Sequence, residues 1–496
     1  MNDRCARTVV TGEQGGAIGR SRCHMALKNI AALVLVAVAQ SALAFDFEAP
    51  FKDPLLTLPP VIESGATLPG DSEPVPCLVT KDFSSPLFLS EAVDLALCNN
   101  PQIRSAWAGI KTQAGAVGEA RAAYLPTLSA STNYLRTHTT YKGLGASEIV
   151  TRGQTLYGTL AWRIFDFGGR EANREAANSL LVAAMANHDA VMQKALAVVI
   201  QYYFDAQTSK AVFLAKEQNV AIALNTLESV QRREARGAVS RSDTLQAATA
   251  LAKVSLEKNR ALGAYQKALA TLVYVLGVPQ RTPVILADDL RETEELEAKS
   301  LETWLDIAER THPAIMVARA QWESAKQKIT ATRAEGLPTV DFSANFYKNG
   351  YPGQGLSPVQ STVDTVGIYV TIPLFDGFSR TYKIRGAEAQ AEQREAELQE
   401  TRNSTLTEVV KTYADALASV QNLQASEHLL SAAQESLNAS QRRYEKGAAD
   451  ILEILNTQAA LSDAQQERIR SLSEWRSARL RLLASVGLIG RAALNQ

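Results

Sequence analysis

The residue types that most often carry out chemistry are scattered along this chain. Its five histidines show no spacing typical of a metal site, and they are His24, His138, His188, His312 and His428. Gly15, Gly16 and Gly19 lack the Gly-x-x-x-x-Gly-Lys spacing of a phosphate-binding loop, and no Gly-x-Ser-x-Gly nucleophile elbow occurs. We therefore predict no enzyme, no metal site and no cofactor, and an enzyme is only a formal alternative.

The first 44 residues have the pattern of a secretory signal peptide. Basic residues precede the apolar run 30–39, and Ala42-Leu43-Ala44 fits a small-residue cleavage site. The run is too short to span a bilayer, and a start at Met25 would give a signal of more ordinary length. The remaining chain carries 46 basic and 50 acidic residues. This balance gives no indication of a nucleic-acid partner. Residues 45–86 are rich in proline and read as an extended N-terminal segment.

Two cysteines, Cys77 and Cys98, survive the predicted cleavage. An even pair in an oxidising compartment favours a disulfide, and the alternative is two unpaired thiols. The bond would fix the proline-rich segment to the first helix of the mature chain.

The elements that would position functional residues occur twice. Phe165-Asp166 returns as Phe375-Asp376 at an offset of 210 residues, which also relates Gly237 to Gly447. Internal repeats usually bury their apolar faces against each other. The predicted organisation follows from this duplication: repeat one over 87–278, a linking strap over 279–300, repeat two over 301–487 and a tail over 488–496.

Long helices are predicted where proline is absent, since proline breaks helix interiors. No proline occurs in 127–278 or in 374–496. We predict that each repeat opens with one helix, over 89–124 and 301–336, and ends with a long helical hairpin, over 170–277 and 380–487. Gly237 and Gly447 mark the turns of the two hairpins.

Four segments alternate between apolar and polar residues, with the period of two expected of β-strands. They cover 127–140, 155–165, 339–347 and 364–374. The residues expected to face lipid are Leu160, Trp162, Phe342, Phe346 and Ile368. A soluble antiparallel sheet would show the same alternation. Because a closed bacterial barrel needs at least eight strands, four strands cannot close alone. Two chains would supply eight strands, and three would supply twelve.

The combined motifs resemble the TolC family of outer-membrane factors over nearly all of the mature chain. One motif lies where a strand enters a long helix, at Pro373-Leu374-Phe375-Asp376-Gly377. Another lies at the hairpin tips, as Gly237-x-x-Ser240-x-x-Asp243-x-Leu245 and Tyr444-x-x-Gly447. The resemblance implies a homotrimer with a twelve-stranded outer-membrane barrel and an α-helical tunnel in the periplasm. It also implies two partners, a periplasmic adaptor and an inner-membrane pump that is either an ABC transporter or proton-driven, together with outer-membrane lipid.

The resemblance further implies a gate at the periplasmic end, closed by hydrogen bonds and ion pairs between hairpin tips. Carried across residue by residue, Asp243 and Tyr444 match the linking aspartate and tyrosine. Ala449 stands where the linking arginine would be, and Arg241 is the candidate replacement. The alternative is that Asp243 only N-caps the return helix.

Carboxylate rings narrow the pore in that family. Glu453 matches the first ring carboxylate, and Asn456 stands where the second would be. The alternative for Glu453 is a solvated helix residue.

The tips would also contact the adaptor, and the residues assigned to this contact are Gly237, Ser240, Leu245, Gly447 and Leu455. The residues assigned to the two junctions between strand and long helix are Phe165, Asp166, Pro373, Phe375, Asp376 and Gly377.

The predicted function is therefore an outer-membrane channel-tunnel of a tripartite export system. The Cys98-Asn99-Asn100-Pro101 context is similar to the protein-secreting branch, including the cyclolysin-secretion type, and this favours type I toxin secretion. Drug efflux is the first alternative, and a secreted coiled-coil structural protein without a channel is the second.

Overall fold

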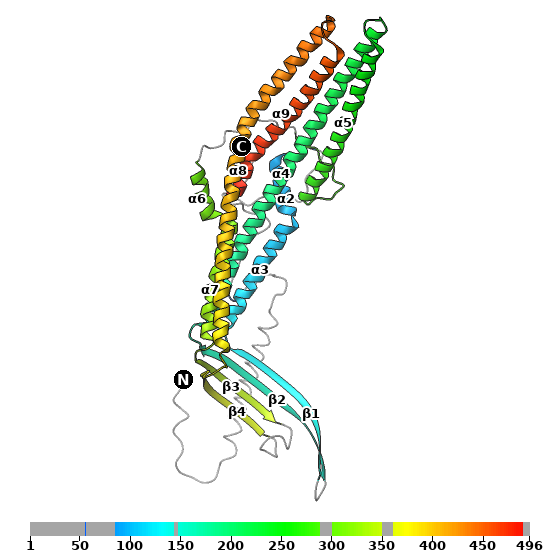
Figure 1. Ribbon diagram of the computed structural model, residues 1–496. Helices are drawn as coiled ribbons and strands as arrows, with labels where there is room; N and C mark the ends of the chain where they lie inside the picture. The colour runs from blue at the N-terminus through cyan, green and yellow to red at the C-terminus, as the bar shows by residue number, and fades with distance from the viewer. Residues whose placement is uncertain (1–54, 56–84, 143–146, 288–299, 350–360, 490–496) are drawn as a thin grey trace, which may run out of the picture. The chain divides into compact units, whose positions relative to one another are not determined.

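The structure is a computed structural model that describes Leu55 and residues 85–142, 147–287, 300–349 and 361–489. The chain divides into two units, residues 1–58 and 59–496, and the description below concerns the second. This unit is mainly helical with one four-stranded antiparallel sheet, as the sequence predicts (Figure 1). The predicted signal peptide and nearly all of the proline-rich segment lie outside the described residues, as do 288–299 of the strap and 490–496 of the tail.

The prediction of a single helix at the start of each repeat was wrong, because each repeat opens with two helices. They are α2 (Leu89–Asn99) and α3 (Pro101–Ala122) in the first repeat, and α6 (Leu301–Thr311) and α7 (Pro313–Ala334) in the second. Each break falls before a proline, which disfavours helical conformation at the residue that precedes it. Asn100 and His312 are extended, and the side chain of each accepts a hydrogen bond from the backbone N–H of the second residue of the next helix. The proline thus begins a new helix.

Two long hairpins follow the strands, as predicted. They consist of α4 (Gly169–Glu234) with α5 (Arg241–Val275), and of α8 (Ser379–Glu445) with α9 (Ile451–Val486). At 1.5 Å per residue, α4 and α8 are each about 100 Å long. In the part of the chain that the structure describes, no helix combines the length and the apolar character needed to cross a membrane.

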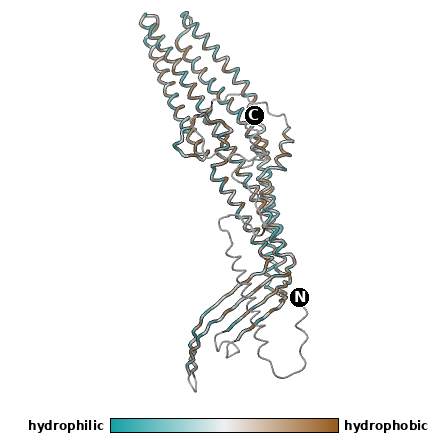
Figure 2. The backbone as a smooth tube through the Cα atoms, turned by 180° about the vertical axis from the view of Figure 1, so that it is seen from behind, coloured by the Kyte–Doolittle hydropathy of each residue, from teal (hydrophilic) through white to brown (hydrophobic). Residues whose placement is uncertain are grey.

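The strands β1 (Thr127–Tyr141), β2 (Ser147–Phe165), β3 (Thr339–Asn349) and β4 (Ser361–Thr371) form a sheet in that order. The start of β2 was predicted eight residues too late and the end of β4 three residues too late. The start of β2 was missed because the mainly polar segment 147–154 shows little alternation of apolar residues. The structure nevertheless pairs this segment with the backbone of β1 along its whole length. The strands change repeatedly between hydrophobic and hydrophilic residues (Figure 2).

The register places most of the large apolar residues of the four strands on one face. Leu128 lies opposite Leu160, Leu160 opposite Ala344, and Ala344 opposite Val366. The neighbouring row runs through Trp162, Phe342 and Ile368. The opposite face is mainly polar, so the sheet has one apolar and one polar surface.

The largest hydrophobic cluster lies where α2 packs against α4 and α5. Leu196 and Leu272 are fully buried there, and each such side chain stabilises the fold by about 1.5–3 kcal/mol. Leu87 forms a parallel bridge with Leu286, and the Tyr203 hydroxyl donates to the carbonyl of Leu87 over 3.0 Å. The segment after α5 is thereby attached to the start of repeat one.

Candidate functional site

The two hairpin turns have the same backbone geometry. Gly237 and Gly447 have φ of +72° and +73°, in the left-handed region that favours glycine. Each glycine follows the last turn of a long helix, and the next residue donates back to that helix: Ala238 to Arg233 over 2.9 Å and Ala448 to Arg443 over 2.8 Å. These are helix C-caps, and they place the return helices α5 and α9 in equivalent positions.

Asp243 closes the N-terminus of α5. Its Oδ2 accepts a hydrogen bond from the backbone N–H of Ser240 over 3.0 Å, and the Ser240 Oγ accepts from the N–H of Asp243 over 3.3 Å. This reciprocal pair is a capping box. The carboxylate is therefore engaged in capping, and no direct hydrogen bond to Tyr444 occurs among the described residues.

Tyr444 is the central residue of the tips. The residue is 6% exposed and belongs to a cluster with Val230, Ile451 and Ile454. The guanidinium of Arg233, from α4, lies 4.4 Å from the ring centroid and donates to the Tyr444 carbonyl over 2.8 Å. This cation–π contact and hydrogen bond connect the first hairpin to the second.

Burial raises the pKa of the Tyr444 phenol, and the negative charge of Asp243 raises it further, while Arg233 opposes the shift. The hydroxyl oxygen has no hydrogen-bond partner in the described part of the chain. Asp243 and Tyr444 thus interact through space, although no hydrogen bond joins them.

Glu453 lies in the first turn of α9, where Asp450 caps its backbone N–H over 2.8 Å. Its Oε1 accepts from Arg443 Nη1 over 2.8 Å and from the Ser440 hydroxyl over 3.2 Å. The side chain of Glu453 is 31% exposed, against 58% for Arg443. Glu453 is therefore an ion-paired carboxylate and not an isolated one.

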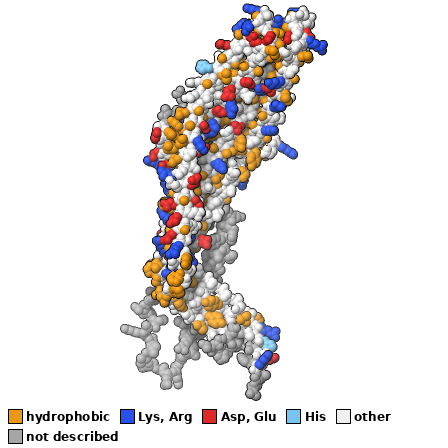
Figure 3. All heavy atoms as spheres, in the orientation of Figure 1, with side chains coloured by type: hydrophobic (Ala, Val, Ile, Leu, Met, Phe, Trp, Pro, Cys, Tyr) orange, Lys and Arg blue, Asp and Glu red, His pale blue; other side chains and the backbone are white. Residues whose placement is uncertain are grey.

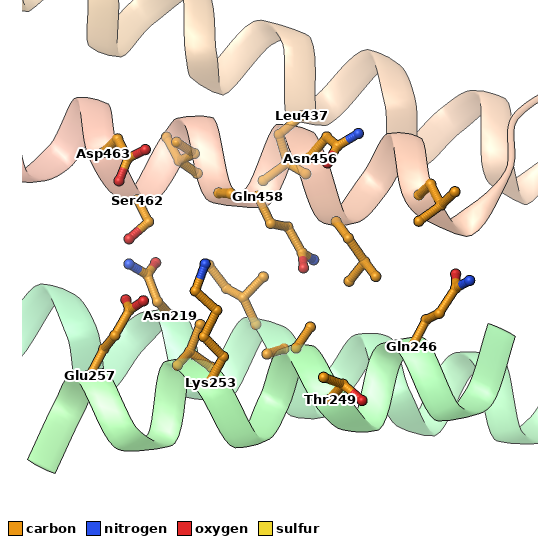
Figure 4. A pocket seen from close by; sticks show the side chains of 18 of the residues that line it. Asn219, Gln246, Thr249, Lys253, Glu257, Leu437, Asn456, Gln458, Ser462 and Asp463 are labelled. Carbon is orange, nitrogen blue, oxygen red and sulfur yellow. The ribbon is translucent and has the colours of Figure 1, made fainter. Parts of the chain in front are cut away.

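A cleft of about 550 Å³ separates the two hairpins next to the tips. Leu245 and Gln246 of α5 line one side, and Leu455, Asn456 and Gln458 of α9 line the other. Figure 4 shows polar side chains from both hairpins turned toward this space. The predicted tip residues Leu245, Leu455 and Asn456 therefore share one groove.

Polar contacts continue between the hairpins beside this groove. Lys216 of α4 is 8% exposed, and its Nζ lies 3.0 Å from Glu257 Oε2 of α5 and 2.9 Å from the hydroxyl of Ser462 of α9. Closer to the tips, the Gln458 amide donates to the Thr226 hydroxyl over 2.7 Å. These contacts hold α9 against the first hairpin.

Sequence reasoning did not assign a role to Arg233 or Arg443, which contact Tyr444 and Glu453 at the tips. Arg241 is exposed and has no hydrogen-bond or ion-pair partner in the described part of the chain, so the structure does not bring it to Tyr444. Arg233 occupies that place instead. The repeat itself contained the signal, because Arg233 and Arg443 are related by the 210-residue offset.

The junctions of strand and helix are also alike in the two repeats. Asp166 accepts from the backbone N–H of Arg170, and Asp376 from that of Arg380, each over 2.9 Å. Phe167 and Phe378 have φ of 51° and 65°, which is uncommon for aromatic residues.

Hydrophobic side chains gather where the helices meet the sheet (Figure 3). Phe165 is 50% exposed, and Leu374 and Phe375 are 90% and 75% exposed. Pro373 is partly buried, and Gly377 has φ of +66° in the turn before α8.

Cys98 takes part in a disulfide. Its expected partner Cys77 lies outside the described residues, so the Cys77–Cys98 pairing stays a prediction. Among the described residues, no cluster of three or more His, Cys, Asp or Glu side chains could hold a metal ion.

Comparison with known families gives a match to the model for outer membrane efflux proteins over residues 92–278 and 304–488. The chain belongs to this family. The two matched ranges correspond to the two repeats, so each repeat is one copy of the family unit.

Two relatives and one solved structure illustrate the match. Protein CyaE of Bordetella pertussis is 36% identical over 442 residues, covering 89% of this chain and 92% of that protein. The alkaline protease secretion protein AprF of Pseudomonas aeruginosa is 24% identical, covering 84% and 88%. The MtrE outer membrane channel of Neisseria gonorrhoeae, solved in its open state, matches with a TM-score of 0.68 and 19% identity, covering 85% and 98%.

These matches confirm the predicted family and fold class. They also confirm the predicted localisation in the outer membrane, with the helical part in the periplasm. At the level of the family, the predicted function as an outer-membrane export channel is confirmed as well.

Proposed function

We propose that three copies of this chain form a twelve-stranded barrel in the outer membrane that continues into an α-helical tunnel in the periplasm. The tunnel receives its substrate from an inner-membrane pump and a periplasmic adaptor. The substrate proposed is a secreted protein, passed to the exterior by type I secretion.

The sheet carries this proposal. Its order is β1-β2-β3-β4, so β1 and β4 are edge strands with unpaired backbone groups. Such edges must be paired or covered, above all in lipid, where every backbone polar group needs a partner. Three copies joined edge to edge satisfy them and give twelve strands.

The two faces of the sheet fit a barrel wall. On the apolar face, Val366 and Ile368 are 70% and 66% exposed, and nothing in the described part of the chain covers them. On the polar face, Arg163 Nε lies 2.9 Å from Asp341 Oδ1, and the Tyr157 hydroxyl donates to Asn345 over 3.1 Å. An outward apolar face and a polar interior are the features of a water-filled membrane barrel.

Protein cargo is supported by two relatives named for the secretion of proteases, AprF of Pseudomonas aeruginosa and PrtF of Dickeya chrysanthemi. The efflux alternative is supported by the family description, which is that of outer membrane efflux proteins. Deletion of the gene and its complementation with this chain distinguish the two. If the cargo is protein, the deletion strain loses one large extracellular protein at unchanged drug sensitivity, and complementation restores that protein. If the function is efflux, the deletion strain becomes more drug-sensitive with unchanged extracellular protein, and complementation restores resistance.

The gate belongs to the same proposal. Tyr444, the Arg233 contact and the charge of Asp243 hold the tips together, and Arg233 supplies the link that Ala449 lacks. Glu453 and Arg443 form a ring of ion pairs around the axis of the trimer, with Asn456 further along α9. The groove lined by Leu245 and Leu455, next to the turns at Gly237 and Gly447, is where the adaptor would dock.

A pair of arginine substitutions tests the barrel. Ile368→Arg places a charge on the apolar face and is expected to cost about 2–4 kcal/mol at mid-membrane depth. Thr371→Arg, on the polar face, is the matched control and is expected to assemble normally. Outer-membrane fractionation and heat-modified migration in a gel measure assembly, and equal tolerance of both substitutions would exclude the barrel.

A further inference from the structure

Two arginines face each other on the hairpin of β1 and β2. In the register of the sheet, Arg136 lies directly opposite Arg152. Both side chains are exposed, and neither has a hydrogen-bond or ion-pair partner in the described part of the chain. Directly opposite residues of an antiparallel pair have Cβ atoms about 5 Å apart, where like charges destabilise the sheet. An anion bound between them would remove this repulsion.

The acidic groups nearby do not fill this role. Glu148 is the acidic residue of the same hairpin, and its Oε2 lies 3.5 Å from His138 Nε2. It lies four residues from Arg152 along β2, about 13 Å at the rise of a strand. On the neighbouring strand β3, Lys348 lies opposite Leu156, four residues from Arg152 along β2, so it is no closer to the arginine pair than Glu148 is.

The two arginines lie at a defined distance from the other end of the apolar face. Trp162 is ten residues from Arg152 along β2 and donates from its indole to the Tyr124 carbonyl over 2.9 Å, at the end of α3. Ten residues at the rise of a strand, tilted by about 40°, correspond to roughly 25 Å across the membrane. This is the height of the apolar band of an outer-membrane barrel.

Tyr134, the next residue on this face from Arg136, also indicates that the arginines lie at the outer edge of the apolar band. Tyr134 is two residues from Arg136 on β1 and 70% exposed. Tyrosine and tryptophan are enriched at the two membrane–water interfaces. Trp162 and Tyr134 thus mark the two interfaces, and Arg136 and Arg152 lie just beyond the outer one, at headgroup depth.

We propose that Arg136 and Arg152 form a binding site for the phosphate of an outer-leaflet lipid, such as the phosphorylated headgroup of lipopolysaccharide. Guanidinium groups bind phosphate oxygens through paired, charge-assisted hydrogen bonds. The acyl chains would lie against the apolar face below, which includes Leu156 and Leu160. This inference rests on the proposed barrel, since that barrel exposes this face to the outer leaflet.

The test uses the mature full-length protein, extracted in mild detergent and mixed with purified lipopolysaccharide or with its dephosphorylated form. Native mass spectrometry counts the bound lipids. Wild type is expected to retain lipopolysaccharide, and Arg136→Gln with Arg152→Gln is expected to bind it at least about tenfold more weakly. Replacing both arginines with lysine is expected to restore most of the binding. The matched control removes two exposed arginines of the helices by Arg260→Gln with Arg319→Gln and is expected to bind like wild type.

Each remaining outcome is decisive. Equal binding by wild type and the double glutamine variant overturns the site, as does equal binding of the dephosphorylated lipid. Competition by millimolar inorganic phosphate as effective as that by the lipid would assign the site to free phosphate and overturn the lipid proposal. Heat-modified migration is measured on the same samples. If wild type forms no membrane oligomer, the proposed function fails, whereas normal oligomers without selective binding reject the lipid site alone.

Discussion

The tips of the two hairpins carry equivalent acidic residues that make different contacts. Asp243 and Glu453 are related by the 210-residue offset, and both occupy the third position of a return helix. Asp243 turns back to the N–H of Ser240, whereas Glu453, one methylene longer, reaches Arg443 and Ser440. The shorter acid caps its helix, and the longer one joins the two helices of its hairpin.

The equivalent arginines differ in the same way. Arg233 bridges the hairpins by contacting Tyr444, while Arg443 stays within its own hairpin by pairing with Glu453. The position of Tyr444 is occupied in the first repeat by Glu234, which offers no ring to stack on. Duplication therefore determined the backbone positions, and single side chains gave the two copies separate roles.

The junctions of strand and helix repeat this contrast. Arg170 and Asp166 have side chains only 13% and 12% exposed, and Arg170 donates to the carbonyls of Ala123, Arg163 and Ile164. The equivalent Arg380 and Asp376 are 31% and 38% exposed. The second junction follows the edge strand β4, so a neighbouring copy would complete its surroundings.

The largest predicted effect tests the two junctions against each other. Arg170→Ala leaves Asp166 buried without its charged partner and removes three hydrogen bonds to carbonyls, for an expected cost of about 2–4 kcal/mol. Arg380→Ala is the matched variant and should cost about 1 kcal/mol, because its ion pair is more exposed. Urea unfolding of dissociated chains measures both. Equal costs would show that the junctions are equivalent after all.

A second prediction concerns the arginines of the tips. Arg233→Ala removes the stacking on Tyr444 and the contact between hairpins, and should weaken the tips by about 1–2 kcal/mol. Arg443→Ala breaks a mostly exposed pair and should cost less than about 1 kcal/mol. In planar bilayers, Arg233→Ala is therefore expected to raise single-channel conductance, and Arg443→Ala to leave it nearly unchanged. If Arg443→Ala raised the conductance and Arg233→Ala left it unchanged, Arg233 would not be part of the gate.

Much of this architecture was predictable from sequence, for identifiable reasons. The absence of proline over 127–278 and 374–496 predicted the long hairpins, and alternation predicted the strands. The breaks before Pro101 and Pro313 were missed because the flanking segments both read as helix. Segment 147–154 was missed because its polar residues give no alternating pattern. The contact of Arg233 with Tyr444 depends on how two distant hairpins pack, and local sequence does not encode that.

A third, smaller prediction concerns charge in the pore. Glu453→Gln leaves Arg443 without its partner and makes the ring more positive, so preference for cations should fall a few-fold. Arg443→Gln frees the Glu453 carboxylate and should raise that preference by a similar factor. Reversal potentials in a salt gradient measure both variants. A change of the same sign in the two would show that this pair does not line the pore.

The smallest expected effect concerns the coupling of Asp243 to Tyr444. Burial and the charge of Asp243 raise the pKa of Tyr444 above 10.0, its ordinary value. A raised pKa in the fold means that the neutral phenol contributes stability that is fully present below pH 10. This contribution is lost as the pH rises through the higher pKa of the folded state. Asp243→Asn should therefore lower the pKa of Tyr444, and Tyr444→Phe should abolish the alkaline loss of tip stability.

Ultraviolet difference titration of each protein against its Tyr444→Phe counterpart isolates this one phenol. Tyr124 provides the control, because burial and a hydrogen bond to Glu171 raise its pKa to about 12 independently of the tips. Its titration should be the same in all variants. If Asp243→Asn left the titration of Tyr444 unchanged, Asp243 would only cap α5, and the contact between the hairpin tips would depend on Arg233 and the packing around Tyr444.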